Sequence, residues 1–316
     1  MPDQTPSILV AGAINTDLVA LVERAPSAGE TITGHSFAIF GGGKGANQAV
    51  AARRAGANVA LLGAVGNDDF GSARRAELEA EGIDLESIAR RDDIPSGVAA
   101  ITVESGGENR IAYIPGATLT VTAEEAANAF LRVMPTILLA TLELPMEALT
   151  RLFRLAREHA CQTILAATPE PETARALLRD VDVLVVNRGE AAVLLAVSSE
   201  NIDTEDLQHQ LEQLGPSTVV LTLGEYGVVA LVDGDLVRQP AFEVDVVDTT
   251  GAGDAFTGVV AAALSESRSM TDALRRGLAA GGLATTKQGA QTSMPYRDAI
   301  DDMVRATKVT TSAESY

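Results

Sequence analysis

The chain has 316 residues, 46% of them hydrophobic and 21% charged, which is enough to bury the core of one large domain or of a domain with an appendage. Its formal net charge of −19 argues against nucleic-acid binding, because phosphates would be repelled, and provides no basic surface for a membrane. A single cysteine, Cys161, permits no internal disulfide, and neither a signal peptide nor a membrane-length apolar run is found. We therefore expect a cytoplasmic enzyme or binding protein.

Short apolar runs alternate with helical stripes along the chain. The runs cover 7–14, 58–65, 136–142, 163–167, 182–186 and 218–223, and they suit strands covered on both faces. Stripes at 146–156 and 207–214 predict helices, the second after a cap at Asp203 or Thr204. The alternation predicts a doubly wound, mostly parallel α/β sheet flanked by helices, in which ligands bind beyond the carboxyl ends of the strands.

Two extended segments interrupt this alternation. Residues 29–40 contain little helical signal, and residues 97–114 read as two strands around a turn at Gly106-Gly107. We expect a small β-sheet lid made from segments of about 15–40 and 97–115, inserted in a single α/β domain that covers 1–316. The alternative is that both segments are edge strands of the main sheet.

Polar side chains follow two of the predicted strands. Asn15 and Asp17 come just after the first run, and Glu143 comes just after the run at 136–142. Strand ends are where ligands of α/β proteins bind, so Asn15 and Asp17 could hold adjacent hydroxyl groups. A capping Asx turn is an equally good interpretation of the first pair alone.

The segment 41–57 reads G-G-G-K-G-A-N-Q-A-V-A-A-R-R-A-G-A. It is not a Walker phosphate loop, because Gly45 follows Lys44 where Ser or Thr is needed. Bare backbone lets a ligand approach closely, and Lys44 and Asn47 supply donors. We predict that a helix begins near Asn47 and that the loop suits a polyhydroxyl ligand as well as a phosphate.

N-R-G-E at 187–190 follows the run at 182–186. An amide and a carboxylate at a strand end could orient magnesium-bound waters or phosphates, and the alternative is a cap at a helix start.

D-T-T-G-A-G-D at 248–254 opens an apolar helical run. The glycines would aim free amides outward at a helix start, which makes an anion site, and Asp254 could take a proton from a nucleophile attacking a bound phosphoryl group. On G-A-G-D alone, a capped glycine turn is the favoured interpretation. The three histidines are far apart, and no hydrolase triad or dinucleotide-binding G-x-G-x-x-G motif is found.

Taken together, the segments at 41–57 and 248–258, with N-x-x-E between them, resemble the two signatures of the PfkB family of carbohydrate kinases. The resemblance runs from about 8 to about 305. It implies the ribokinase-like fold with a β-sheet lid, and transfer of the ATP γ-phosphoryl group to a sugar hydroxyl. It further implies a homodimer in which two lids clasp.

The resemblance also implies a role for each matching position. Asp254 would be the catalytic base, with the amides of Gly251, Ala252 and Gly253 as the anion hole. The remaining expected positions are Asn15, Asp17, Gly42, Gly43, Lys44, Asn47, Glu143 and Asp254 for the sugar; Asn187, Thr222, Gly224, Gly227 and Gly253 for ATP; Glu190, indirectly, for Mg²⁺; and Asp248, Thr250, Ala284, Lys287, Gly289 and Ser293 for K⁺.

The expected reaction is phosphorylation of the primary hydroxyl of D-ribose to ribose 5-phosphate. Two departures from the family pattern bear on the sugar: Thr168-Pro169 replaces Asn-Pro, and G-A-T at 116–118 replaces Gly-Ala-Asn. The alternatives are a family kinase for fructose, a deoxy sugar acid or a nucleoside, and a non-catalytic sugar-binding sensor. The absence of Trp and an aromatic content of 3% disfavour the nucleoside, whose base needs an apolar platform.

Overall fold

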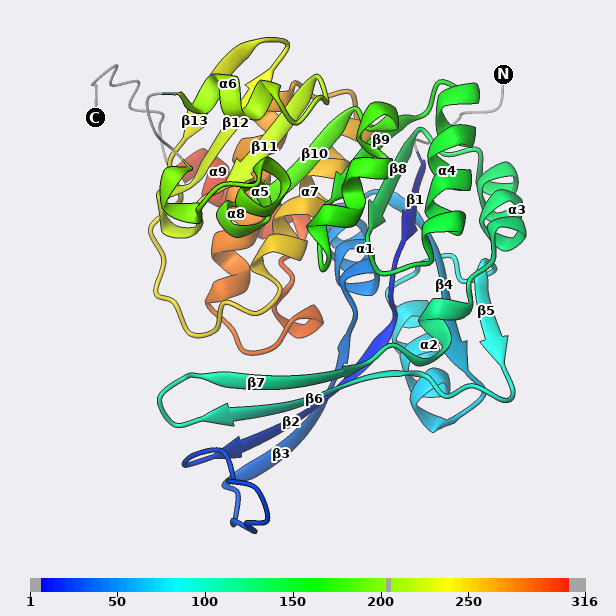
Figure 1. Cartoon of the computed structure of the whole chain (residues 1–316), viewed down its shortest axis with the longest axis vertical. Helices are drawn as coiled ribbons and strands as arrows, with labels where there is room; N and C mark the ends of the chain where they lie inside the picture. Colours follow the sequence, from blue (N-terminus) through cyan, green and yellow to red (C-terminus); the bar gives the residue numbers. More distant parts are fainter. Residues whose placement is uncertain (1–6, 203–205, 307–316) are drawn as a thin grey trace.

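A nine-stranded sheet forms the centre of the molecule (Figure 1). The computed structural model describes residues 7–202 and 206–306. The spatial order of the strands is β13-β12-β11-β10-β9-β8-β1-β4-β5, and all neighbours are parallel except β11/β12 and β12/β13. The strands are β1 (Ser7–Ala11), β4 (Asn58–Gly66), β5 (Ile88–Arg91), β8 (Ile137–Thr141), β9 (Gln162–Ala166), β10 (Val183–Asn187), β11 (Thr218–Thr222), β12 (Val228–Val232) and β13 (Asp235–Gln239).

Helices cover both faces of this sheet. One core cluster packs α3, α4, α5 and α6 against one face, and a second packs α1, α2, α7, α8 and α9 against the other. The helices are α1 (Lys44–Arg54), α2 (Asp69–Ala80), α3 (Ala123–Val133), α4 (Met146–Glu158), α5 (Arg188–Leu195), α6 (Leu207–Glu212), α7 (Ala252–Ser265), α8 (Met270–Thr285) and α9 (Arg297–Ala306). The predicted doubly wound α/β class is confirmed. Within the described residues, none of these helices has the length and apolarity needed to cross a membrane.

A second sheet of four strands, in the order β3-β2-β6-β7, extends away from the main body (Figure 1). It consists of β2 (Asn15–Val22), β3 (Ser36–Gly42), β6 (Gly97–Glu104) and β7 (Asn109–Ile114). The β6–β7 hairpin turns at the predicted glycine pair, where Gly107 has a φ of +85°. These segments are therefore not edge strands of the main sheet.

Two predicted boundaries differ from the structure. The first apolar run ends as a strand at Ala11, because the chain then crosses into β2 of the small sheet. Helix α1 begins at Lys44 rather than near Asn47, since Gly43 (φ +89°) turns the chain directly into the first helical turn. The expected cap at Asp203 or Thr204 lies outside the described residues.

Helices α1 and α7 pack backbone to backbone at Gly258. A Cβ atom on Gly258 would lie 2.5 Å from the Gln48 carbonyl oxygen and 2.8 Å from the Ala51 Cβ. Only a glycine allows this approach, which sets the distance between the two helices that carry Gln48 and Asp254.

Gly258→Ala is expected to lower the free energy of unfolding by about 1–3 kcal/mol, because the added methyl group forces α1 and α7 apart. Urea unfolding followed by circular dichroism measures the change. Gly282→Ala in α8 is the matched control: its Cβ would meet nothing closer than 3.7 Å, so it should be neutral or stabilising by up to about 1 kcal/mol. Equal effects of the two substitutions would contradict the packing argument.

Candidate active site

The candidate site lies where β1 ends and α1 begins. Gly12, just after β1, and Gly45, in the first turn of α1, are in direct contact: a Cβ on Gly12 would lie 2.7 Å from the Gly45 Cα. The mutual contact of two glycines brings the end of a central strand against a helix start, which is the position predicted for ligand binding.

The Glu143 carboxylate locks this junction. Its Oε2 accepts hydrogen bonds from the Ala13 amide (2.8 Å), the Gly45 amide (3.1 Å) and the Thr141 hydroxyl (2.9 Å). Its Oε1 accepts one bond, from the Lys44 amide at 3.1 Å. Glu143 is 8% exposed, so these charge-assisted bonds compensate the cost of burying the carboxylate. Glu143 thus caps α1 and ties it to the end of β1.

Asp254, in the first turn of α7, faces α1. Its Oδ2 accepts a hydrogen bond from Asn47 Nδ2 (2.9 Å), and its Oδ1 accepts one from Gln48 Nε2 (3.0 Å). Desolvation by the protein raises the pKa of the Asp254 carboxyl group, while the Lys44 ammonium and the two amide donors act in the opposite direction. A carboxylate with a raised pKa and fixed donors is suited to accept a proton.

Asp254 lines a cavity of about 170 Å³. The residues around it include the expected Lys44, Glu190, Gly251 and Gly253, together with Gln48, Thr168 and Thr257. Asn187 and Thr222 line this cavity and also an adjoining open pocket of about 660 Å³, which Gly224 and Tyr226 line as well. The expected nucleotide positions therefore lie next to Asp254, although Gly227 does not line either space.

The glycine turn before α7 leaves amides available. Gly251 is the N-cap of α7 with a φ of +77°, and the Ala252 amide makes a long bond of 3.3 Å to the Thr249 carbonyl oxygen. Within the described residues, the amides of Gly251, Gly253 and Asp254 make no hydrogen bond. Such free amides at a helix start are donors for an anion.

The small sheet places Asn15 and Asp17 on one face. Both belong to β2, two residues apart, and Asn15 pairs with Gly42 of β3. The carboxylate of Asp17 lies over Gly42, where a Cβ would be 2.3 Å from both of its oxygens. Burial raises the pKa of Asp17 to about 6, against the Arg74 guanidinium of α2, which lowers it. The Asn15 Oδ1 atom is buried without a hydrogen-bond partner in the part of the chain that the structure describes.

The N-x-x-E segment forms a capping box at the start of α5. The Glu190 amide donates to Asn187 Oδ1 (2.9 Å), and the Asn187 amide donates to Glu190 Oε2 (2.8 Å). The capping interpretation is thus correct, and it does not exclude the other, because both residues also line the cavity next to Asp254. Desolvation raises the pKa of Glu190.

The Asp248 carboxylate joins the two loops expected to hold K⁺. Its Oδ1 accepts from the Thr250 amide and its Oδ2 from the Gly289 amide, each at 2.9 Å. Of the other expected positions, Ala284 accepts a bond from the Lys287 amide at 3.4 Å, and the Ser293 hydroxyl donates to Ala290 at 2.7 Å. Within 7–202 and 206–306, no three His, Cys, Asp or Glu side chains gather as a metal site.

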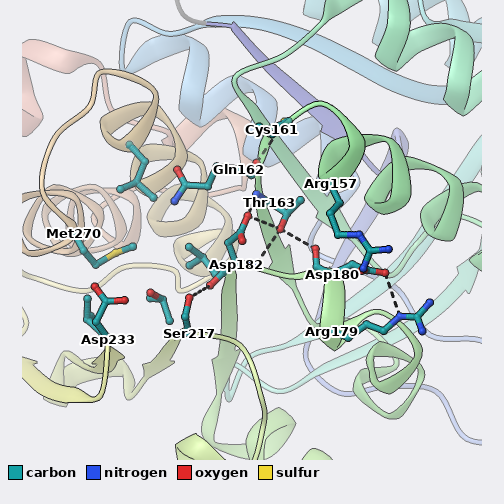
Figure 2. Close-up of a pocket in the computed structure, with 15 residues that line it drawn as sticks. Arg157, Cys161, Gln162, Thr163, Arg179, Asp180, Asp182, Ser217, Asp233 and Met270 are labelled. Atoms are coloured by element: carbon teal, nitrogen blue, oxygen red, sulfur yellow. Dashed lines mark hydrogen bonds and ion pairs between the residues drawn. The ribbon is translucent and has the colours of Figure 1, made fainter.

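A larger cavity, about 670 Å³, lies at the opposite edge of the main sheet, at the amino ends of β9, β10 and β11 (Figure 2). Its polar groups bind one another. Thr163 and Asp182 exchange three hydrogen bonds of 2.7–3.0 Å, and Arg157 pairs with Asp180 at 2.6 Å. Cys161 also lines it, and burial raises the pKa of this thiol to about 12. Size alone therefore does not identify the site.

Sequence reasoning missed four residues of the site: Gln48, Thr257, Thr168 as a wall of the cavity, and Arg74. Gln48 stands beside Asn47 within the quoted glycine segment, and a second amide side chain at the predicted helix start was the available signal. Arg74 could not be found from its helix pattern, because its link to Asp17 depends on how α2 packs under the small sheet. Thr118, which stands where the family pattern has Asn, is buried, and its hydroxyl has no hydrogen-bond partner among the described residues.

Comparison with known proteins places these residues in context. The family model of the pfkB family carbohydrate kinases matches residues 5–297. The chain is 34% identical over 297 residues to the ribokinase of Haemophilus influenzae, covering 92% of this chain and 96% of that protein. It is 33% identical to a bifunctional ribokinase/ribose-5-phosphate isomerase A of Fructilactobacillus sanfranciscensis, but spans only 57% of that longer protein. The solved structure of Arabidopsis thaliana ribokinase complexed with ribose and ATP superposes with a TM-score of 0.86 at 27% identity, covering 95% of this chain and 99% of that one.

Glu143→Gln is expected to lower the free energy of unfolding by about 2–4 kcal/mol, because the new amide group presents donors to a junction made of donors. Thermal and urea unfolding measure the loss. Glu147→Gln, at an exposed position in the first turn of α4, is the matched control and should change stability by less than about 0.5 kcal/mol. If both variants are as stable as the parent, Glu143 does not lock the junction.

Proposed function

The chain belongs to the pfkB family of carbohydrate kinases, and we propose that it transfers the γ-phosphoryl group of ATP to the primary hydroxyl of D-ribose, giving ribose 5-phosphate. One observation carries the proposal: the cavity at Asp254 and the open pocket beside it share Asn187 and Thr222. A nucleotide in the open pocket would direct its terminal phosphate toward Asp254. The similarity to ribokinases, one of them solved with ribose and ATP, supports this choice of substrates.

In this reaction Asp254 acts as the base. It accepts the proton of the sugar hydroxyl while that oxygen attacks the γ-phosphorus in line, and the bond to the β-phosphate oxygen breaks. The unpaired amides of Gly251 and Gly253, with the Ala252 amide whose bond is long, hold the equatorial phosphoryl oxygens. Lys44, which lines the same cavity, adds positive charge.

Ribose lies between the small sheet and the start of α1. Asn15 and Asp17 share a face of β2 beside Gly42, and Gly43 allows the sharp turn into α1. The ionised Asp17 accepts sugar hydroxyls, and Asn47 is within reach of both the sugar and Asp254. Among the described residues, Glu143 Oε1 accepts a single hydrogen bond, from the Lys44 amide, so it retains capacity for a hydroxyl donor.

ATP, Mg²⁺ and K⁺ are the proposed cofactors. Gly224 lines the open pocket, and Gly227 (φ +92°) closes the loop after β11, which suits a nucleotide-binding loop. Glu190 fits indirect Mg²⁺ binding, since its carboxylate lines the cavity beside Asp254, and bound Mg²⁺ would neutralise phosphate charge. For K⁺, the loops joined by Asp248 offer backbone carbonyl oxygens, which suit a hard monovalent cation.

We further propose a single domain over 1–316 whose small sheet serves as a lid and pairs with the lid of a second copy, in the cytoplasm. Large apolar side chains are exposed on that sheet, which favours a partner. They are Leu21 (38% exposed), Phe37 (62%), Ile39 (50%), Ile111 (57%), Tyr113 (42%) and Ile114 (47%).

With Mg²⁺ and K⁺ present, the purified chain is expected to release ADP fastest with D-ribose among ribose, deoxyribose, fructose, a deoxy sugar acid and nucleosides. A coupled ADP-release assay measures this, and omission of K⁺ should slow the reaction. If another substrate gives a faster rate, that compound and not ribose is the preferred phosphoryl acceptor, and the proposed reaction type is unchanged. Sugar binding by calorimetry without any ADP release would indicate a non-catalytic sensor.

Asp254→Asn is expected to lower kcat by about 10²–10⁴-fold, because the hydroxyl loses its proton acceptor. Ribose affinity, measured by calorimetry, should stay within a few-fold of the parent. Asp235→Asn, the same change at an exposed position on β13, is the control and should leave both values unchanged. Near-parental turnover of Asp254→Asn would refute the base assignment.

A further inference from the structure

We propose that Gln48 is a positioning residue for the reaction, which holds Oδ1 of Asp254 throughout the cycle so that Oδ2 is the oxygen presented to the sugar hydroxyl. This inference rests on the proposed role of Asp254 as base and adds a residue to which no role has been assigned. It starts from the two amide side chains at the start of α1, each of which donates to one oxygen of the same carboxylate.

The orientation of both amides is fixed by chemistry. A carboxylate can only accept hydrogen bonds, so Asn47 and Gln48 must each turn their NH₂ group toward Asp254. The distances, 2.9 Å to Oδ2 and 3.0 Å to Oδ1, are those of charge-assisted bonds. The carboxylate is thus clamped against rotation about its Cβ–Cγ bond by one donor on each side.

The two amide side chains that hold Asp254 differ in whether they also contact the sugar. Asn47 is one of the proposed sugar-binding positions, and on that basis its amide turns to the sugar when ribose binds and leaves Oδ2 open for the hydroxyl proton. Gln48 is 1% exposed, and its backbone carbonyl lies in the tight α1–α7 contact at Gly258. Gln48 is not among the proposed sugar-binding positions, so in this proposal its bond to Oδ1 persists.

A packing role does not account for Gln48. Its Oε1 is buried and has no hydrogen-bond partner among the described residues, which is unfavourable and which an apolar side chain would avoid. In the described structure, the one side-chain hydrogen bond formed by Gln48 is the bond to Asp254. The glutamine is thus explained by the orientation of the base.

Removing this donor has two consequences for catalysis. A carboxylate free to rotate spends less time with an oxygen aligned to the hydroxyl, so kcat falls while sugar binding persists. Loss of a donor to the charged form also raises the pKa of Asp254. The acidic limb of the kcat–pH profile, below which the base is protonated, then moves to higher pH.

Other ionisable groups surround Asp254, and the substitution leaves them in place. They are Lys44 on α1, Glu143 after β8, Asp17 on β2 and Glu190 on α5. Asp17, with a pKa of about 6, is a second carboxyl group near the site that can titrate in such a profile. The comparison of variant with parent at saturating ribose therefore isolates the change at Asp254.

The test is Gln48→Met, which keeps the volume and removes the donor. We expect kcat to fall by about 10- to 100-fold, KM for ribose to change less than about threefold, and the acidic limb of kcat to rise by about one pH unit. Val50→Ala is the control, because Val50 is equally buried on α1 and lies in the core cluster rather than against Asp254. It should lower thermal stability without moving the limb.

An unmoved limb with parental kcat in Gln48→Met would overturn the inference, and so would an equal shift in Val50→Ala. If Gln48→Met does not fold, Gln48→Glu replaces it: its charge repels Asp254, so the limb should rise further, and an unmoved limb overturns the inference as well. Asp254→Asn separates the two proposals. If Asp254→Asn is active, the proposed role of Asp254 as base is refuted. If Asp254→Asn is inactive and the acidic limb of Gln48→Met lies at the same pH as that of the parent, only the proposed role of Gln48 is refuted.

Discussion

The carboxylate of Glu143 is the interaction on which the rest of the site depends. One buried anion accepts the amides of Ala13, Lys44 and Gly45, and so joins the end of β1 to the start of α1. The Gly12–Gly45 contact makes this possible, because a Cβ on either residue would separate the two backbones. The start of α1 is thereby fixed at the carboxyl edge of the sheet, where a ligand of this fold is bound.

The position of α1 then determines that of the candidate base. Lys44, Asn47 and Gln48 lie within the first turns of α1, so all three point into the same region. Gly258 brings α7 against α1 at van der Waals distance, and Asp254 stands one turn before Gly258. Two glycine contacts and one carboxylate therefore place the candidate base, from the C-terminal third of the chain, beside the glycine segment at 41–57, from its first fifth.

Much of this could be predicted from the sequence, because local patterns determine it. The apolar runs became strands, and the small sheet followed from the hairpin at Gly106-Gly107. The features that could not be predicted from the sequence depend on tertiary contacts between distant segments. The Lys44 amide at the start of α1 is capped by a carboxylate 99 residues away, and the raised pKa of Asp17 depends on its burial in the folded chain. The pairing of Gln48 with Asp254 spans 206 residues, so it required the α1–α7 packing to be known.

The electrostatics of the site explain its glycines. The chain carries a net charge of −19, and Asp17, Glu143, Glu190 and Asp254 all lie at or near the cavity. Among the described residues lining that cavity, Lys44 is the one cation. A phosphoryl group entering it needs further positive potential, and the unpaired amides at the start of α7 supply this without adding a side chain. A positively charged side chain at 251 or 253 would lower the pKa of Asp254 and weaken it as a base, whereas backbone dipoles at a glycine turn attract the phosphate and leave the carboxylate basic.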